Sequence, residues 1–119
     1  MFDHLGLHVR DLAASITFYT AALAPLGHVL GSRDETSAGF GPPGAPALWL
    51  YASKTTSTGV HLAFTTTKRA LVDQFHAAGI KAGAKDHGKP GLRADYSPTY
   101  YAAFLIDPDG NNVEAVCTV

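Results

Sequence analysis

Three histidines and one glutamate have the residue types and spacing to work together chemically. His4 and His8 interrupt the apolar stretch DHLGLHV, His61 opens VHLAFTT, and Glu114 lies inside NVEAVC. If each stretch is a β-strand, the side chains alternate between its two faces. These four side chains then lie on one face of their strands, and most of the apolar residues lie on the other. A carboxylate in an apolar strand costs several kcal/mol to bury unless it meets a cation or a metal. Two imidazoles and one carboxylate are a suitable ligand set for a divalent metal, so the pattern predicts a metal site.

The first half of the chain is typical of a strand, a helix and further strands. Asp11 can cap a helix whose apolar residues recur at helical spacing before a proline and a glycine end it: Leu12, Ile16, Tyr19 and Leu23, then Pro25 and Gly27. We expect a weak strand over 28–33, a Gly- and Pro-rich connection over 39–47, and a strand over 47–52. The small polar residues 53–59 mark the best internal boundary.

The second half repeats the first, which predicts an internal duplication. A strand over 60–66 precedes a helix that Thr67 can cap and Gly79 can end. An offset of 57 residues places His4 on His61, and apolar pairs follow: Leu5 and Leu62, Leu7 and Phe64, Phe18 and Phe75.

The end of the second half predicts a hairpin. Two strands, 100–106 and 112–117, flank the turn sequence DPDGN, which would set Glu114 in place. The preceding loop, 86–98, has no counterpart in the first half and is long enough to carry function.

Composition predicts a single domain over residues 1–119, with one module over about 1–53 and another over about 60–119. The formal net charge of −1, without blocks of like charge, argues against nucleic-acid and membrane partners. Cys117 is the only cysteine, which excludes an internal disulfide and favours a cytoplasmic setting. The N-terminal sequence lacks a signal-peptide core, and no run of 18 apolar residues occurs.

Three stretches, HLGLHVRDLAASITFY, VHLAFTT and FLIDPDGNNVEAV, resemble the vicinal oxygen chelate superfamily, which includes glyoxalase I, extradiol dioxygenases, fosfomycin-resistance enzymes and bleomycin-resistance proteins. The resemblance covers essentially the whole chain, and DPDGNNVE is its most specific part. It implies an α+β fold of two βαβββ modules that form an open, cup-shaped mixed sheet with helices on the outer face. By motif match it also implies that His4, His61 and Glu114 are the ligands of a divalent metal such as Zn, Ni, Mn or Fe.

One position departs from the glyoxalase I pattern. Trp49 stands where those enzymes carry a fourth, acidic ligand, which leaves the two-His, one-Glu set that resembles dioxygenases and transferases of the superfamily. Such a metal would act as a Lewis acid on a small molecule with neighbouring oxygens, in a lyase, isomerase, transferase or dioxygenase reaction. His8 is the candidate general base, because histidine commonly changes protonation near neutral pH. Candidate substrate contacts are Trp49, Tyr51, Arg93, Tyr96 and Tyr100 or Tyr101.

A second hypothesis assigns the chain to a different functional class, a binding protein. The same fold could be a metal-free binding protein of the bleomycin-resistance type, which holds a planar drug or metabolite between aromatic walls. In either case we expect a homodimer, because an open sheet leaves edges and apolar surface that need covering. The sequence leaves open whether one chain or two build each cup.

Overall fold

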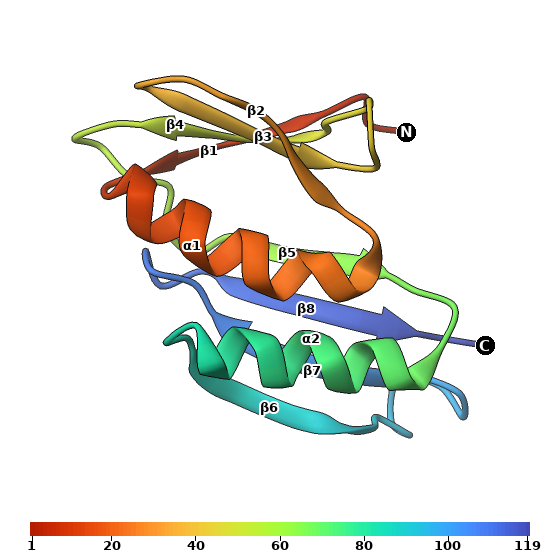
Figure 1. Cartoon of the computed structure of the whole chain (residues 1–119). Helices are drawn as coiled ribbons and strands as arrows, with labels where there is room; N and C mark the ends of the chain where they lie inside the picture. The colour runs from red at the N-terminus through yellow and green to blue at the C-terminus, as the bar shows by residue number, and fades with distance from the viewer.

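Each half of the chain folds as a strand, a helix and three further strands (Figure 1). The computed structural model describes all residues from 1 to 119. The first half contains β1 (Leu5–Val9), α1 (Leu12–Leu23), the short 3-10 helix η1 (Ala24–Leu26), β2 (Val29–Arg33), β3 (Ser37–Gly41) and β4 (Leu48–Ala52). The second half contains β5 (His61–Thr65), α2 (Arg69–Lys81), β6 (Lys85–Leu92), β7 (Tyr101–Ile106) and β8 (Asn112–Cys117).

The strands form two open sheets of four strands with the same topology. The N-terminal sheet has the order β1-β4-β3-β2, and the C-terminal sheet has the order β5-β8-β7-β6. In each sheet the first strand runs parallel to the last strand of its module, while the other pairs are antiparallel. The predicted α+β class with two βαβββ modules is therefore confirmed.

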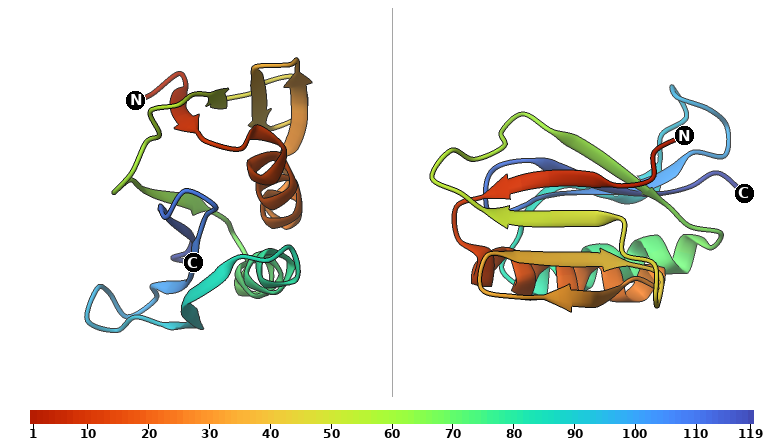
Figure 2. Two further views of the ribbon diagram at one scale, coloured as in Figure 1. Left: turned by 90° about the vertical axis from the view of Figure 1, so that its left-hand side faces the viewer. Right: turned by 90° about the horizontal axis from the view of Figure 1, so that it is seen from above.

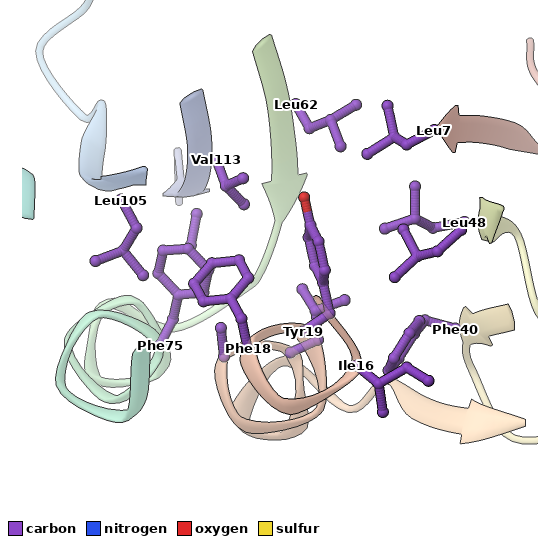
Figure 3. Packing of buried hydrophobic residues seen from close by; sticks show 14 of the residues in the cluster. Leu7, Ile16, Phe18, Tyr19, Phe40, Leu48, Leu62, Phe75, Leu105 and Val113 are labelled. Atoms are coloured by element: carbon purple, nitrogen blue, oxygen red, sulfur yellow. The ribbon is translucent and has the colours of Figure 1, made fainter. Parts of the chain in front are cut away.

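Both helices pack on the inner side of the bend between the two sheets. Figure 2 shows the sheets wrapped around the adjacent helices, and Figure 3 shows apolar side chains pointing from both sheets toward them. Phe18, Tyr19 and Phe75 are among the largest buried side chains in this core. Because the helices fill the inside of the bend, the helix-free faces of the two sheets look outward. These two faces therefore do not form a closed cup within one chain.

A buried carboxylate joins the two modules. Asp107 begins the turn between β7 and β8, and its Oδ2 accepts a 2.7 Å hydrogen bond from the Tyr19 hydroxyl of α1. Its Oδ1 accepts bonds from the backbone N–H groups of Asp109 and Asn111. Burial and the neighbouring Asp107 carboxylate raise the pKa of Tyr19 well above its usual value, so its hydroxyl remains a donor at neutral pH. The turn that starts β8 is thereby fixed against the first module.

The predicted caps are right for one helix and wrong for the other. Asp11 caps α1 and accepts a 3.0 Å bond from the Ala14 N–H, as expected. Thr67 does not cap α2, since Lys68 occupies that position without a side-chain bond. Gly79 does not end α2 either: it lies inside the helix, where a Cβ would come within 2.2 Å of Leu105. Its role is to let α2 approach β7 closely.

Two predicted loops contain strands. The Gly- and Pro-rich connection over 39–47 includes the end of β3, and most of the predicted loop over 86–98 is β6. β6 contains Pro90 and shows breaks in register, which an edge strand tolerates because one side of its backbone is unpaired. The true loop lies between β6 and β7. None of the helices is long and apolar enough to cross a membrane.

Candidate functional site

A histidine and a glutamate meet on the helix-free face of the C-terminal sheet, which we call the His61 face. The Nε2 atom of His61 in β5 lies 2.8 Å from Oε1 of Glu114 in β8. The glutamate is only 1% exposed, whereas the side chain of His61 is 54% exposed. The two side chains share one sheet face, as the alternation of the two strands predicted, and a buried carboxylate is thus paired with an accessible imidazole.

Tyr100 provides the second partner of the buried carboxylate. Its hydroxyl donates a hydrogen bond to Oε2 of Glu114, and its ring packs edge-on against Tyr96 with 5.0 Å between ring centroids. Burial and the bond to Glu114 raise the pKa of Tyr100 to about 12. The phenol therefore remains protonated and a hydrogen-bond donor throughout the neutral pH range.

Phe104 and Arg93 complete the His61 face. The ring of Phe104, opposite Glu114 in the β7–β8 register, lies 6.3 Å from the imidazole ring of His61. The guanidinium of Arg93 lies over the Phe104 ring, 5.3 Å from its centroid. Two of its nitrogens donate to the backbone carbonyls of Gly91 and Lys89. These bonds use part of the hydrogen-bonding capacity of Arg93 to hold the backbone next to the loop.

The predicted residues of the first module lie on the helix-free face of the N-terminal sheet, here called the His4 face. His4 is exposed, and its Nδ1 lies 2.6 Å from the Asp3 carboxylate. His8 is also exposed and contacts the ring of Tyr51 edge-on, with 6.2 Å between ring centroids. These residues share a face with each other but do not contact His61 or Glu114 of the same chain.

Two aromatic rings lie across the His4 face because glycines make room for them. A Cβ at Gly39 would come within 2.8 Å of the Trp49 ring, and a Cβ at Gly6 within 2.9 Å of the Tyr51 ring. Both rings therefore cover neighbouring strands and form a shallow aromatic surface. This arrangement fits the predicted aromatic wall for a planar ligand.

The sheet register supports the match between Trp49 and an acidic ligand position. Trp49 pairs with Gly6 in the N-terminal sheet, and Glu114 pairs with Ala63 in the C-terminal sheet. Gly6 and Ala63 are themselves equivalent at the offset of 57 residues. Trp49 thus occupies the position in its module that Glu114 occupies in the other, where an indole cannot coordinate a metal.

The remaining predicted contacts divide between the two sides of the C-terminal sheet. Tyr96 is exposed beside Tyr100. Tyr101 points to the helix side instead, where its hydroxyl donates a 2.6 Å bond to Asp73 and Arg69 lies over its ring. Tyr101 is therefore remote from the His61 face. Alternation could have shown this, since Tyr101 shares its strand face with the core residue Leu105.

Asn112 is a residue of the His61 face that the sequence did not single out. It pairs with His61 in register and lies two residues before Glu114 in β8, so the two side chains share a face. Its Oδ1 atom is buried and has no hydrogen-bond partner. An amide oxygen is a suitable ligand for hard cations, so the donors of this face suit a divalent metal.

Within one chain, no three His, Cys, Asp or Glu side chains come close enough together to hold a metal ion. His61 and Glu114 supply two donors, and the third predicted ligand, His4, lies on the other sheet. Because the two sheets bend around the helices, their helix-free faces do not converge in one chain (Figure 2). The His61 face is therefore half of the predicted ligand set.

A cavity of about 420 Å³ opens at the seam between the free edges of β1 and β5. His4 and His61 lie on its rim, and mainly apolar core residues line the rest, among them Leu23, Phe40, Leu62 and Phe64. His28 also lines this cavity, and its ring centroid lies 6.1 Å from that of Phe64. Burial lowers the pKa of His28 below 6.5.

This partly buried histidine predicts a loss of stability in mild acid. The unfolded chain takes up the His28 proton at a higher pH than the folded chain, so the free energy of unfolding should fall as pH drops below about 6.5. The urea midpoint, measured from pH 7.5 to 5.0, should fall less in His28→Asn than in the wild type. The same slope in both proteins would contradict this role.

Comparison with known proteins identifies the family. The family model for the Glyoxalase/Bleomycin resistance protein/Dioxygenase superfamily matches residues 1–115. A glyoxalase/bleomycin resistance protein from Albidiferax ferrireducens T118 is 32% identical, with 98% of each chain covered and a TM-score of 0.82. A comparison with curated proteins finds no match.

More distant structures share the fold. A glyoxalase/bleomycin resistance protein/dioxygenase family enzyme from Burkholderia phytofirmans PsJN is 20% identical, with 98% of each chain covered and a TM-score of 0.74. A putative glyoxalase from Bacillus halodurans is 24% identical, with 98% of this chain and 95% of that chain covered, also at a TM-score of 0.74. With a family model that spans nearly the whole sequence and two repeated βαβββ modules, the chain belongs to the glyoxalase/bleomycin resistance protein/dioxygenase superfamily.

Proposed function

We propose that this protein is a divalent-metal-dependent enzyme of the glyoxalase/dioxygenase type that acts on a small molecule with two neighbouring oxygens. The observation that carries the proposal is the buried Glu114 carboxylate, which faces the accessible imidazole of His61 at 2.8 Å on a helix-free sheet face. An imidazole nitrogen and a carboxylate oxygen at this separation can bind one ion together once the proton between them leaves.

A second copy of the chain would complete the ligand set. The His4 face and the His61 face look outward from one chain, so a two-fold dimer can place each His4 face against the other chain's His61 face. His4 of one chain would then join His61 and Glu114 of the other. Such a dimer would also cover the exposed Phe2 and Leu5 beside the free edge of β1.

The side chains around this site have separate roles in the proposed reaction. When bound, the metal would supply Lewis-acid stabilisation to an enolate or oxyanion of the substrate. His8 would move a proton with its ring nitrogen, since it shares the His4 face and its side chain is exposed. Trp49 and Tyr51 would hold the planar or apolar part of the substrate, while Tyr96 would contact it from the loop.

Metal content is the direct test of this proposal. The purified protein is exposed to Mn, Fe, Co, Ni and Zn, washed, and analysed by mass spectrometry. We expect one tightly held ion per chain, and turnover of vicinal diols, catechols or 2-oxoaldehyde adducts with the preferred metal. Unchanged turnover in His8→Ala would remove the role of His8 as the base. Absence of any retained metal would contradict the proposal as a whole.

A metal-free binding protein is the second candidate, and the aromatic surface of the His4 face favours it. Trp49 and Tyr51 lie across the sheet where glycines make room, which suits stacking with a planar ligand. We expect such a ligand to quench tryptophan fluorescence, because Trp49 is the only tryptophan.

The glycine beneath the indole gives a sharp test of this second candidate. Gly39→Ala should push the Trp49 ring off the sheet and weaken binding of a planar aromatic ligand about fivefold, because one disturbed aromatic contact is worth about 1 kcal/mol. Gly31→Ala is the matched control for glycine loss, since Gly31 has no positive φ and its added Cβ would meet its nearest atoms at an ordinary contact distance of 3.9 Å. Equal quenching curves for wild type and Gly39→Ala would contradict the stacking role of Trp49.

A further inference from the structure

The loop between β6 and β7 is more ordered than the substrate contact proposed for Tyr96 requires. It runs from Arg93 to Tyr100 and is closed by a 2.7 Å bond from the Arg93 N–H to the Tyr100 carbonyl. Further turn bonds inside it join Tyr96 and Ser97 to the Arg93 carbonyl. The loop is thus a closed unit whose two ends are held side by side.

The side chain of Arg93 ties this loop to the sheet. Its guanidinium donates to the carbonyls of Gly91 and Lys89 in β6, at 2.9 and 2.8 Å, and lies over the ring of Phe104 in β7. Three strand residues therefore restrain one end of the loop. Because the backbone bond joins Arg93 to Tyr100, the same contacts restrain the other end.

Tyr100, at the restrained end of the loop, contacts the buried carboxylate of Glu114. Its hydroxyl donates to Oε2 of Glu114, while Oε1 faces His61. The two oxygens therefore have different tasks: one is held by the phenol, and the other is directed toward the imidazole. Without the phenol, Oε2 would be buried without a donor and the carboxylate would be free to rotate about its terminal bond.

We propose that Tyr100 is a positioning residue that orients Glu114 for metal binding, and that the loop from Arg93 to Tyr100 serves to hold it there. This inference rests on the proposed function, since it assigns an outer-sphere partner to a proposed ligand. Outer-sphere hydrogen bonds of this kind typically change metal affinity by about 10- to 100-fold.

The test compares Co²⁺ binding to the wild type with binding to Tyr100→Phe, which removes only the hydroxyl. Dissociation constants are measured by competition with a chromogenic chelator, and the visible spectrum of the Co²⁺ protein reports its coordination. We expect Tyr100→Phe to bind Co²⁺ about 10- to 100-fold more weakly, with an altered spectrum. Tyr101→Phe is the matched control, because its hydroxyl bonds Asp73 on the opposite side of the sheet, and it should behave as the wild type.

The outcomes separate this inference from the proposed function. If the wild type binds Co²⁺ and Tyr100→Phe binds it equally well with the same spectrum, the positioning role is wrong while the metal proposal stands. If the wild type binds no Co²⁺, both are wrong. Thermal unfolding is recorded alongside, and if Tyr100→Phe does not fold, Arg93→Ala replaces it. That variant keeps the phenol but releases the loop, so it should also weaken Co²⁺ binding, and unchanged affinity would overturn the role of the loop.

Discussion

Glu114→Gln should weaken metal binding strongly while the protein stays folded. The amide keeps the shape of the side chain and can still accept the Tyr100 hydrogen bond, but it lacks the negative charge that a divalent ion requires. We expect the dissociation constant for Co²⁺ or Zn²⁺ to rise by at least about 100-fold, because a direct ligand matters more than an outer-sphere partner. Competition with a chelator measures the affinity, and thermal unfolding shows whether the fold is intact.

Glu35→Gln makes the same chemical change at an exposed position and serves as the control. It should leave the metal affinity at the wild-type level. If Glu114→Gln bound metal as tightly as this control, Glu114 would not be a ligand, and its burial would need a purely structural explanation.

Asp107→Ala should destabilise the protein by about 3–5 kcal/mol, the largest stability effect we expect from a polar residue. The substitution removes the acceptor of the Tyr19 hydroxyl and of the backbone donors that shape the β7–β8 turn. It therefore loosens both the contact between modules and the start of the strand that carries Glu114. The free energy of unfolding is measured from urea titrations at pH 7.

Tyr19→Phe separates the two contributions. It removes one hydrogen bond to Asp107 and leaves the turn bonds in place, so we expect a loss of about 1–2 kcal/mol. A loss in Asp107→Ala no greater than that in Tyr19→Phe would show that the turn bonds contribute little to stability.

Much of the fold could be predicted because the sequence repeats its own pattern. The offset that aligns His4 with His61 also aligns the core residues of both modules, and the structure places β1 and β5 equivalently in their sheets. Strand alternation likewise predicted that His61 and Glu114 share one face. Each of these inferences depends only on local periodicity.

The predictions for β6 and for the end of α2 were wrong because tertiary contacts outweigh local preference there. β6 contains Gly88, Pro90 and Gly91, residues that are poor strand formers, yet it pairs with β7 as an edge strand. Gly79 suggested a helix end, but it lies within α2 because Leu105 leaves no room for a Cβ. A single sequence does not reveal such close approaches between elements.

The direction in which the sheets bend was also beyond local patterns. Alternation placed His4, His61 and Glu114 on helix-free faces, but it could not show that the two faces point away from each other in one chain (Figure 2). Because of that geometry, we propose that each metal site is shared by two chains and is not formed within one chain.

Metal content of a mixture of His4→Ala and Glu114→Ala tests this shared site most directly. Each variant alone should retain no metal. After the two are unfolded together and refolded, about half of the dimers should contain one chain of each kind. Each mixed dimer has one complete site, formed by His4 of one chain with His61 and Glu114 of the other. The mixture should therefore recover about a quarter of the wild-type metal content. No recovery from the mixture, with wild type refolded in parallel retaining its metal, would contradict a site shared between chains.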